Sequence, residues 1–315
     1  MSFKDSLKQH FFWKYAVSEN SLFSESKAVL FQKVNDIMRW TYLFFLFFMF
    51  TRVFGNDNLM EAEMVNPLWP LAILKGIPLE NIMLFIKIVL LFCFLVLSYN
   101  PRIWAVRIIS FIVFFFYVAL ENSFGKINHN LHLSLMLLFC YALMPSNKVV
   151  SCKKKTLLMF ASAQFFLLLA YSLTGFWKLF WGIIQLFSGQ VSIFSPLSFR
   201  NTLIEQFQSF PVTTLGNFFL EHYIFGWLVY LLVIYVELSS ILVFFRPKLH
   251  KAWGFLLLLF HASTALVLGV NMYASVISVG TLLVMSPFAK STTLTETIKQ
   301  MPLVFEINSL LKRKA

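Results

Sequence analysis

Long runs of apolar residues constrain this chain more than any other feature of its sequence. A helix needs about 20 mostly apolar residues to cross the hydrocarbon core of a bilayer. Eight stretches approach that length: 37–54, 82–98, 104–120, 129–143, 156–177, 225–245, 252–270 and 272–288. The fourth is short for a span and almost nothing separates the last two, so the sequence predicts about eight transmembrane helices.

The composition excludes a soluble globular protein. Of the 315 residues, 59% are hydrophobic and only 13% are charged, whereas ordinary soluble domains have about 25% charged residues. The 39 Phe residues and a mean hydropathy of +0.75 indicate more apolar surface than one core of this size could bury. Lipid must therefore solvate much of the chain, and we expect an all-α, polytopic membrane helix bundle.

The distribution of positive charge tests this topology independently. If the N-terminus is inside, the inner segments hold most of the 26 Lys and Arg residues, and the outer segments hold few of them. This positive-inside pattern requires an even number of spans and predicts that both termini are cytoplasmic. It also accounts for the net charge of +12, so the sequence indicates no nucleic-acid partner.

Polarity divides the chain into three parts. Residues 1–36 are too polar for a signal peptide, and apolar residues recur at helical spacing over 24–36. That pattern predicts an amphipathic helix at the inner interface or a solvated lead-in to the first span. Residues 37–288 form the predicted transmembrane domain, and 289–315 form a basic cytoplasmic tail. The longest outer segment, 178–222, is long enough to form a lid or a re-entrant element.

The sequence contains no motif that indicates disulfide bonds or a metal site. Three cysteines are an odd number and imply no disulfide framework. The sequence contains no Cys-x-x-Cys, no His-Glu-x-x-His and no Gly-rich phosphate loop, so we expect no metal site and no nucleotide hydrolysis.

Polar residues in or beside the apolar stretches carry the functional signal, because burying them in lipid requires a partner or a purpose. His129 and His132 are three residues apart on one helical face, directly after Asn128. These residues form either an acid/base or hydrogen-bonding cluster at the mouth of a pocket, or a helix cap at Asn128 with two histidines at the membrane interface. Tyr171, Thr174 and Lys178 share a second face, where the lysine is functional or simply extends to the headgroups.

Two further polar residues lie deeper. Glu237 is in the sixth stretch with no basic residue nearby in sequence, so its carboxyl is either neutral or paired. His261 lies near the middle of the seventh stretch, where it is either a packing residue with a satisfied hydrogen bond or a functional residue. We expect all four places to converge toward the outer half of one bundle.

The order of these residues resembles a known family. The motifs are Asn128-His129, Gly175-x-x-Lys178-Leu179, Glu237 followed by Arg246, Phe260-His261, Gly269-x-x-Met272-Tyr273 and Ser286-Pro287-Phe288. Together they resemble the membrane domain of vitamin K-dependent gamma-glutamyl carboxylase, within the horizontally transferred transmembrane (HTTM) family. The resemblance covers residues 25–290, although Trp177 and Ile127 depart from its motifs and the carboxylases' large luminal region is absent.

The resemblance implies a site. Lys178 would deprotonate vitamin K hydroquinone or another prenylated quinol, and His129 would lie near the reactive end of the quinone. The resemblance adds Asn128, Glu237 and His261 as substrate-binding residues, and the polar residues on the same helical faces, His132, Tyr171 and Thr174, complete the predicted set. An amine in a largely apolar pocket loses hydration of its charged form, which allows it to act as a base.

The sequence leaves the activity open between three classes. The first is a membrane enzyme that acts on a quinol and modifies, or carboxylates, a secreted peptide at the outer face. The second is a non-catalytic partner in maturation of, or immunity to, an exported peptide. The third is a small transporter. In each case the expected location is a bacterial inner membrane or the endoplasmic reticulum, with the site facing away from the cytoplasm.

Overall fold

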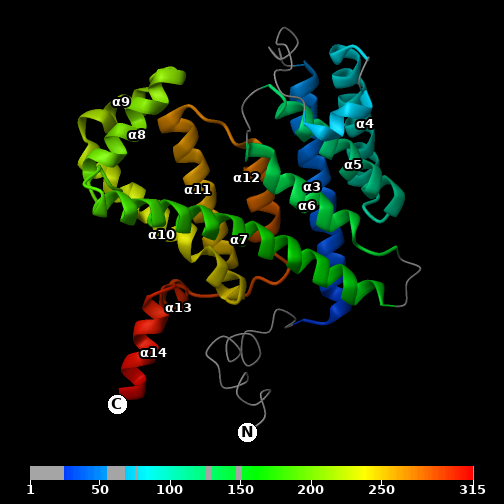
Figure 1. Ribbon diagram of the computed structural model, residues 1–315. Helices are drawn as coiled ribbons and strands as arrows, with labels where there is room; N and C mark the ends of the chain where they lie inside the picture. The colour runs from blue at the N-terminus through cyan, green and yellow to red at the C-terminus, as the bar shows by residue number, and fades with distance from the viewer. Residues whose placement is uncertain (1–24, 55–67, 75–76, 125–128, 147–150, 315) are drawn as a thin grey trace. The chain divides into compact units, whose positions relative to one another are not determined.

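The regular structure of the described residues is helical. The computed structural model describes residues 25–54, 68–74, 77–124, 129–146 and 151–314 (Figure 1), and no strand occurs in these ranges. The chain forms two compact units. The N-terminal unit comprises 25–167 and 273–282, and the C-terminal unit comprises 168–272 and the residues from 283 onward. The predicted all-α class is confirmed.

Six helical segments in the described part of the chain are long and apolar enough to cross a bilayer. They are α3 (Lys27–Phe54), α4 (Leu79–Tyr99), α5 (Trp104–Glu121), α7 (Cys152–Phe187), α10 (Tyr223–Phe244) and the segment Pro247–Leu268, which joins the short η4 (Pro247–Leu249) to α11 (His250–Leu268). These segments correspond to six of the eight predicted spans. Their length and composition are those of an integral membrane protein.

The other two predicted spans are shorter in the structure. Stretch 129–143 forms the short η3 (His129–Leu131) and the 11-residue α6 (His132–Ala142). Stretch 272–288 forms the seven-residue α12 (Tyr273–Val279) followed by one π-helical turn, η5 (Gly280–Val284). Since both fall below the length that a straight span requires, the count of eight stays a prediction.

The N-terminal unit packs around aromatic side chains of its long helices. Tyr42 and Phe45 of α3, Phe94 of α4 and Phe114 of α5 are fully buried. The Phe45 and Phe94 rings stack with their centroids 5.6 Å apart. Because α3 already begins at Lys27, the segment predicted as an amphipathic lead-in continues into the first span as one helix. Residues 1–24 of the predicted N-terminal part lie outside the described residues.

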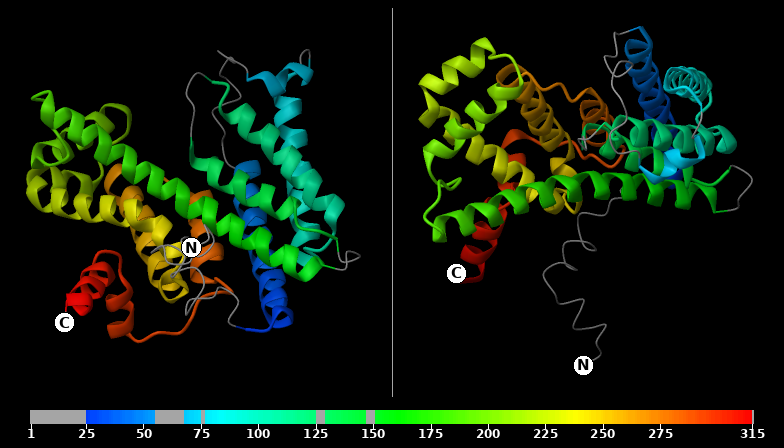
Figure 2. Two further views of the ribbon diagram at one scale, coloured as in Figure 1. Left: turned by 60° about the horizontal axis from the view of Figure 1, so that its bottom comes forward. Right: turned by 45° about the horizontal axis from the view of Figure 1, so that its top comes forward.

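The C-terminal unit contains the end of α7 and most of the shorter helices. α8 (Pro196–Ser209) is capped by the Ser195 hydroxyl, and α9 (Thr214–Glu221) is capped by that of Thr213. Both pack on α10 and α11 (Figures 1 and 2). The predicted outer segment 178–222 is therefore the last turns of α7 followed by two helices. The tail forms α13 (Leu294–Gln300) and α14 (Val304–Lys314).

Candidate functional site

The site begins with a close approach between α7 and α10. A Cβ atom on Gly175 would lie 2.5 Å from the backbone nitrogen of Leu238 and 2.9 Å from Cβ of Glu237, so no larger residue fits there. One turn earlier, the Ser172 hydroxyl accepts a hydrogen bond from the Ile241 amide at 2.7 Å and donates to the Leu238 carbonyl at 3.0 Å. These contacts fix the two helices at the level of Glu237.

Lys178 and Glu237 form an ion pair across this contact. Lys178 Nζ donates to both carboxylate oxygens of Glu237, at 2.7 and 2.9 Å. The Glu237 side chain is only 2% exposed, and that of Lys178 is 28% exposed. Of the two alternatives that the sequence leaves for Glu237, the structure has the paired one. Its partner is 59 residues away in sequence.

Aromatic rings surround the Lys178 amine. Its Nζ lies 5.9 Å from the ring centroid of Tyr230 and 5.9 Å from that of Phe260. At such distances, the face of an aromatic ring attracts a cation. Phe260 also packs beside His261, with their centroids 5.0 Å apart, so the predicted Phe260-His261 motif reaches the site.

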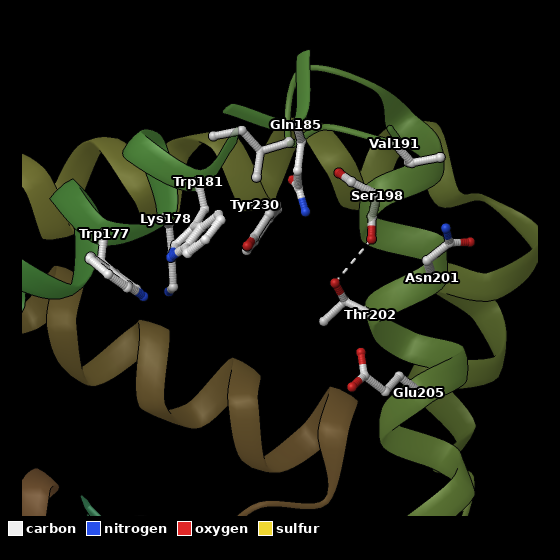
Figure 3. A pocket seen from close by; sticks show the side chains of 11 residues that line it. Trp177, Lys178, Trp181, Gln185, Val191, Ser198, Asn201, Thr202, Glu205 and Tyr230 are labelled. Carbon is white, nitrogen blue, oxygen red and sulfur yellow. Dashed lines mark hydrogen bonds between the residues drawn. The ribbon is translucent and has the colours of Figure 1, made fainter. Parts of the chain in front are cut away.

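A cavity of about 390 Å³ opens beside this pair (Figure 3). It is lined by Trp177, Lys178, Trp181, Gln185, Val191, Ile193, Ser198, Asn201, Thr202, Glu205 and Tyr230. Figure 3 shows Lys178 between Trp177 and Trp181, with the polar side chains of α8 across the cavity. Trp181 and Tyr230 were not among the residues predicted for the site. The signal was available, since Trp181 follows Trp177 by one helical turn and Tyr230 precedes Glu237 by two.

Tyr171 and His261 form a second buried contact in the C-terminal unit. The Tyr171 hydroxyl and His261 Nε2 are 2.5 Å apart, and His261 Nδ1 has no partner among the described residues. Thr174 differs from its predicted companions. Its side chain is exposed, and its hydroxyl donates to the Ala170 carbonyl at 3.0 Å, so its substrate-binding role stays a prediction.

The histidine cluster belongs to the other unit. His129 and His132 of the N-terminal unit approach each other with their Nδ1 atoms 3.0 Å apart, and Asn128 lies outside the described residues. The structure thus brings together three of the four predicted places, those of Lys178, Glu237 and His261. That His129 and Lys178 act on the same quinol stays a prediction. Among the described residues, no group of three or more His, Cys, Asp or Glu could hold a metal ion.

Comparisons with protein-family models, with curated proteins and with solved structures give no match for this chain. The resemblance to the HTTM family therefore depends on the motifs themselves. Of these, Gly175, Lys178, Glu237 and Phe260-His261 lie together in the C-terminal unit.

Proposed function

We propose that this chain is an integral membrane enzyme related to the HTTM family and the vitamin K-dependent carboxylases. In this proposal it has eight spans with both termini cytoplasmic, and it removes a phenolic proton from a prenylated quinol on the outer side. One observation carries it: the Lys178 amine, paired with the buried Glu237 carboxylate, lines a cavity that also holds three aromatic rings and the polar side chains of α8.

The cavity suits an amphipathic aromatic ligand. Its volume of about 390 Å³ falls within the usual range for small-molecule sites, about 300–1,000 Å³. Trp177, Trp181 and Tyr230 offer ring faces for stacking on a quinol headgroup. The prenyl tail of such a ligand would extend among the Phe-rich helices, where lipid is the solvent.

The ion pair supplies a proton path in which every proton has a donor and an acceptor. Lys178 first passes one ammonium proton to the Glu237 carboxylate across the existing hydrogen bond. The neutral amine then takes the phenolic proton of the bound quinol. The net change is quinol plus carboxylate to quinolate plus carboxylic acid. Lys178 is then the relay and Glu237 the final acceptor, which differs from a lone lysine base.

Binding and deprotonation are tested separately. The chain, purified in detergent, is extracted with organic solvent to detect a co-bound quinone, and then titrated anaerobically with a short-chain quinol in nanodiscs. We expect quinone in the extract and the longer-wavelength absorbance of a quinolate on titration. The E237Q variant should lose that absorbance, whereas K248Q, which removes a cation outside the cavity, should retain it.

Two outcomes would contradict the proposal. One is an empty extract together with no spectral change in the wild-type protein. The other is a K178A variant that inserts normally and keeps the full function of the wild-type protein. A scaffold or partner protein would behave in this way. Substrate uptake into proteoliposomes by the same variant would instead support a transporter.

A further inference from the structure

The C-terminal helix α14 presents an apolar stripe on one face. Leu303 directly precedes α14, and Ile307 and Leu311 within it are four residues apart, which places these two on one side of the helix. Their exposed fractions are 61%, 57% and 61%. α13 adds exposed Leu294 and Ile298 at the same spacing.

Other residues of the same segment are fastened to the C-terminal end of α10. Arg246 forms an ion pair with Glu306, donates to the Gln300 carbonyl at 2.9 Å, and lies 4.8 Å from the Phe305 ring centroid. The Arg246 side chain is only 3% exposed. α14 is therefore held to the transmembrane helices by one side, while the apolar stripe faces outward. Figure 1 draws α14 in red, with its free end pointing away from α10 and α11.

The anchor also sets the depth at which α14 begins. The Tyr235 hydroxyl donates to the Pro302 carbonyl at 2.8 Å. Tyr235 precedes the last residue of α10, Phe244, by nine residues, or about 14 Å along the helix axis. Pro302 consequently lies alongside α10, and this contact holds the start of α14 against that helix.

The charges at the C-terminal end of α14 have one sign. The last three residues of α14 are Lys312, Arg313 and Lys314, and no acidic residue follows Glu306 in the sequence. Lys248 and Lys251 belong to η4 and α11, which directly follow the end of α10. Each cation close to an anionic lipid surface contributes about 1 kcal/mol of attraction.

We infer that α14 binds the surface of the surrounding bilayer. Leu303, Ile307 and Leu311 lie at the boundary between headgroups and acyl chains, and the basic last turn binds anionic headgroups. A protein partner fits less well. Stable protein interfaces bury about 1,200 Å² or more, and a three-residue stripe offers only a fraction of that area. This inference is independent of the quinol proposal.

The test uses the full chain in nanodiscs with a spin label at Ile307→Cys, in a Cys152→Ser background. The other two cysteines, Cys93 and Cys140, are buried. The accessibility of the label to dissolved oxygen and to a water-soluble nickel chelate is compared with that of a label at Asn308→Cys. With anionic lipid present, we expect oxygen to be favoured at position 307 and the chelate at 308.

Matched charge variants identify the source of the binding. The triple variant K312Q/R313Q/K314Q should lower the bound-to-free ratio of α14 roughly 100-fold, from about 1 kcal/mol per charge and 1.4 kcal/mol per factor of ten. The variant K153Q/K154Q/K155Q removes the same charge at the start of α7 and should leave the ratio unchanged.

Three results would overturn the inference. The first is equal chelate access at positions 307 and 308. The second is the same loss in both triple variants, which would indicate a general charge effect. The third is spin–spin broadening between copies that does not depend on lipid composition, which would assign the stripe to a second copy of the chain.

Discussion

Glu237 is the residue on which the candidate site depends most. Its carboxylate is almost completely removed from water, and both of its oxygens accept from the Lys178 amine. Removing one member of such a pair leaves a buried charge uncompensated, whereas replacing both with apolar residues is often neutral. The two residues should therefore respond very differently to single and double substitution.

We expect Lys178→Met to lower the free energy of unfolding by about 3 kcal/mol. That is the low end of the range for broken buried pairs, because Lys178 keeps part of its hydration. The double variant K178M/E237L should recover most of this loss. Reversible unfolding in mixed micelles measures both values. Equal destabilisation by the single and double variants would show that the pair is not the cause.

The sequence predicted this residue-level arrangement only in part. It singled out both Lys178 and Glu237 as charges beside or within apolar stretches, and it left pairing open for Glu237. It did not join them, because 59 intervening residues hide a contact that depends on how α7 and α10 pack. Two opposite charges isolated in separate spans are a usable signal for such a pair.

At the scale of helices, the site depends on the narrow contact between α7 and α10 at Gly175. The short distances from its Cβ position to α10 show that only a residue without a side chain fits there. Helix lengths were harder to predict. Stretch 129–143 is mostly apolar after its two histidines, but its helix α6 has only 11 residues, since apolar composition does not determine where a helix begins.

Gly175→Ala should destabilise the protein by about 1–3 kcal/mol, because the added methyl group meets the backbone of α10, which cannot rotate away. Gly280→Ala is the matched control, since no heavy atom lies within 4 Å of its Cβ position. Thermal unfolding in detergent compares the two. Equal stability of G175A and G280A would contradict the close approach.

Arg246→Gln should release the C-terminal arm formed by α13 and α14. Hydrogen bonds to charged groups contribute about 1.5–3 kcal/mol, so amide hydrogen exchange in α14 should become about tenfold faster or more. Lys248→Gln, two residues away, should leave the exchange rates unchanged. Unaltered protection of α14 in R246Q would show that other contacts fasten the arm.

For the whole molecule, membrane topology is the main prediction that comes from charge alone. Lys154, at the start of α7, should lie on the cytoplasmic side and Ser188, directly after its end, on the outer side, because the basic run at the start of α7 follows the positive-inside rule. A membrane-impermeant thiol reagent applied to intact cells should label Ser188→Cys and leave Lys154→Cys unlabelled. Labelling of K154C from outside would reverse the topology.

The relation between the two units decides whether the histidine cluster joins the site. The sequence could place His129 and Lys178 at the ends of neighbouring spans, but distances between helices are not encoded in apolar periodicity. The resemblance to the carboxylases requires the two residues to act on one quinol. A short bismaleimide applied to the variant with His129→Cys and Thr174→Cys, one turn before Lys178, tests that requirement.

The control for this cross-link lies on a single helix. Lys154→Cys and Thr174→Cys are 20 residues apart on α7, or about 30 Å, so the same reagent should not join them. If each cysteine of the first pair reacts alone but the pair never cross-links, His129 does not share the cavity. The proton path would then be confined to the C-terminal unit, because Lys178 and Glu237 both belong to it.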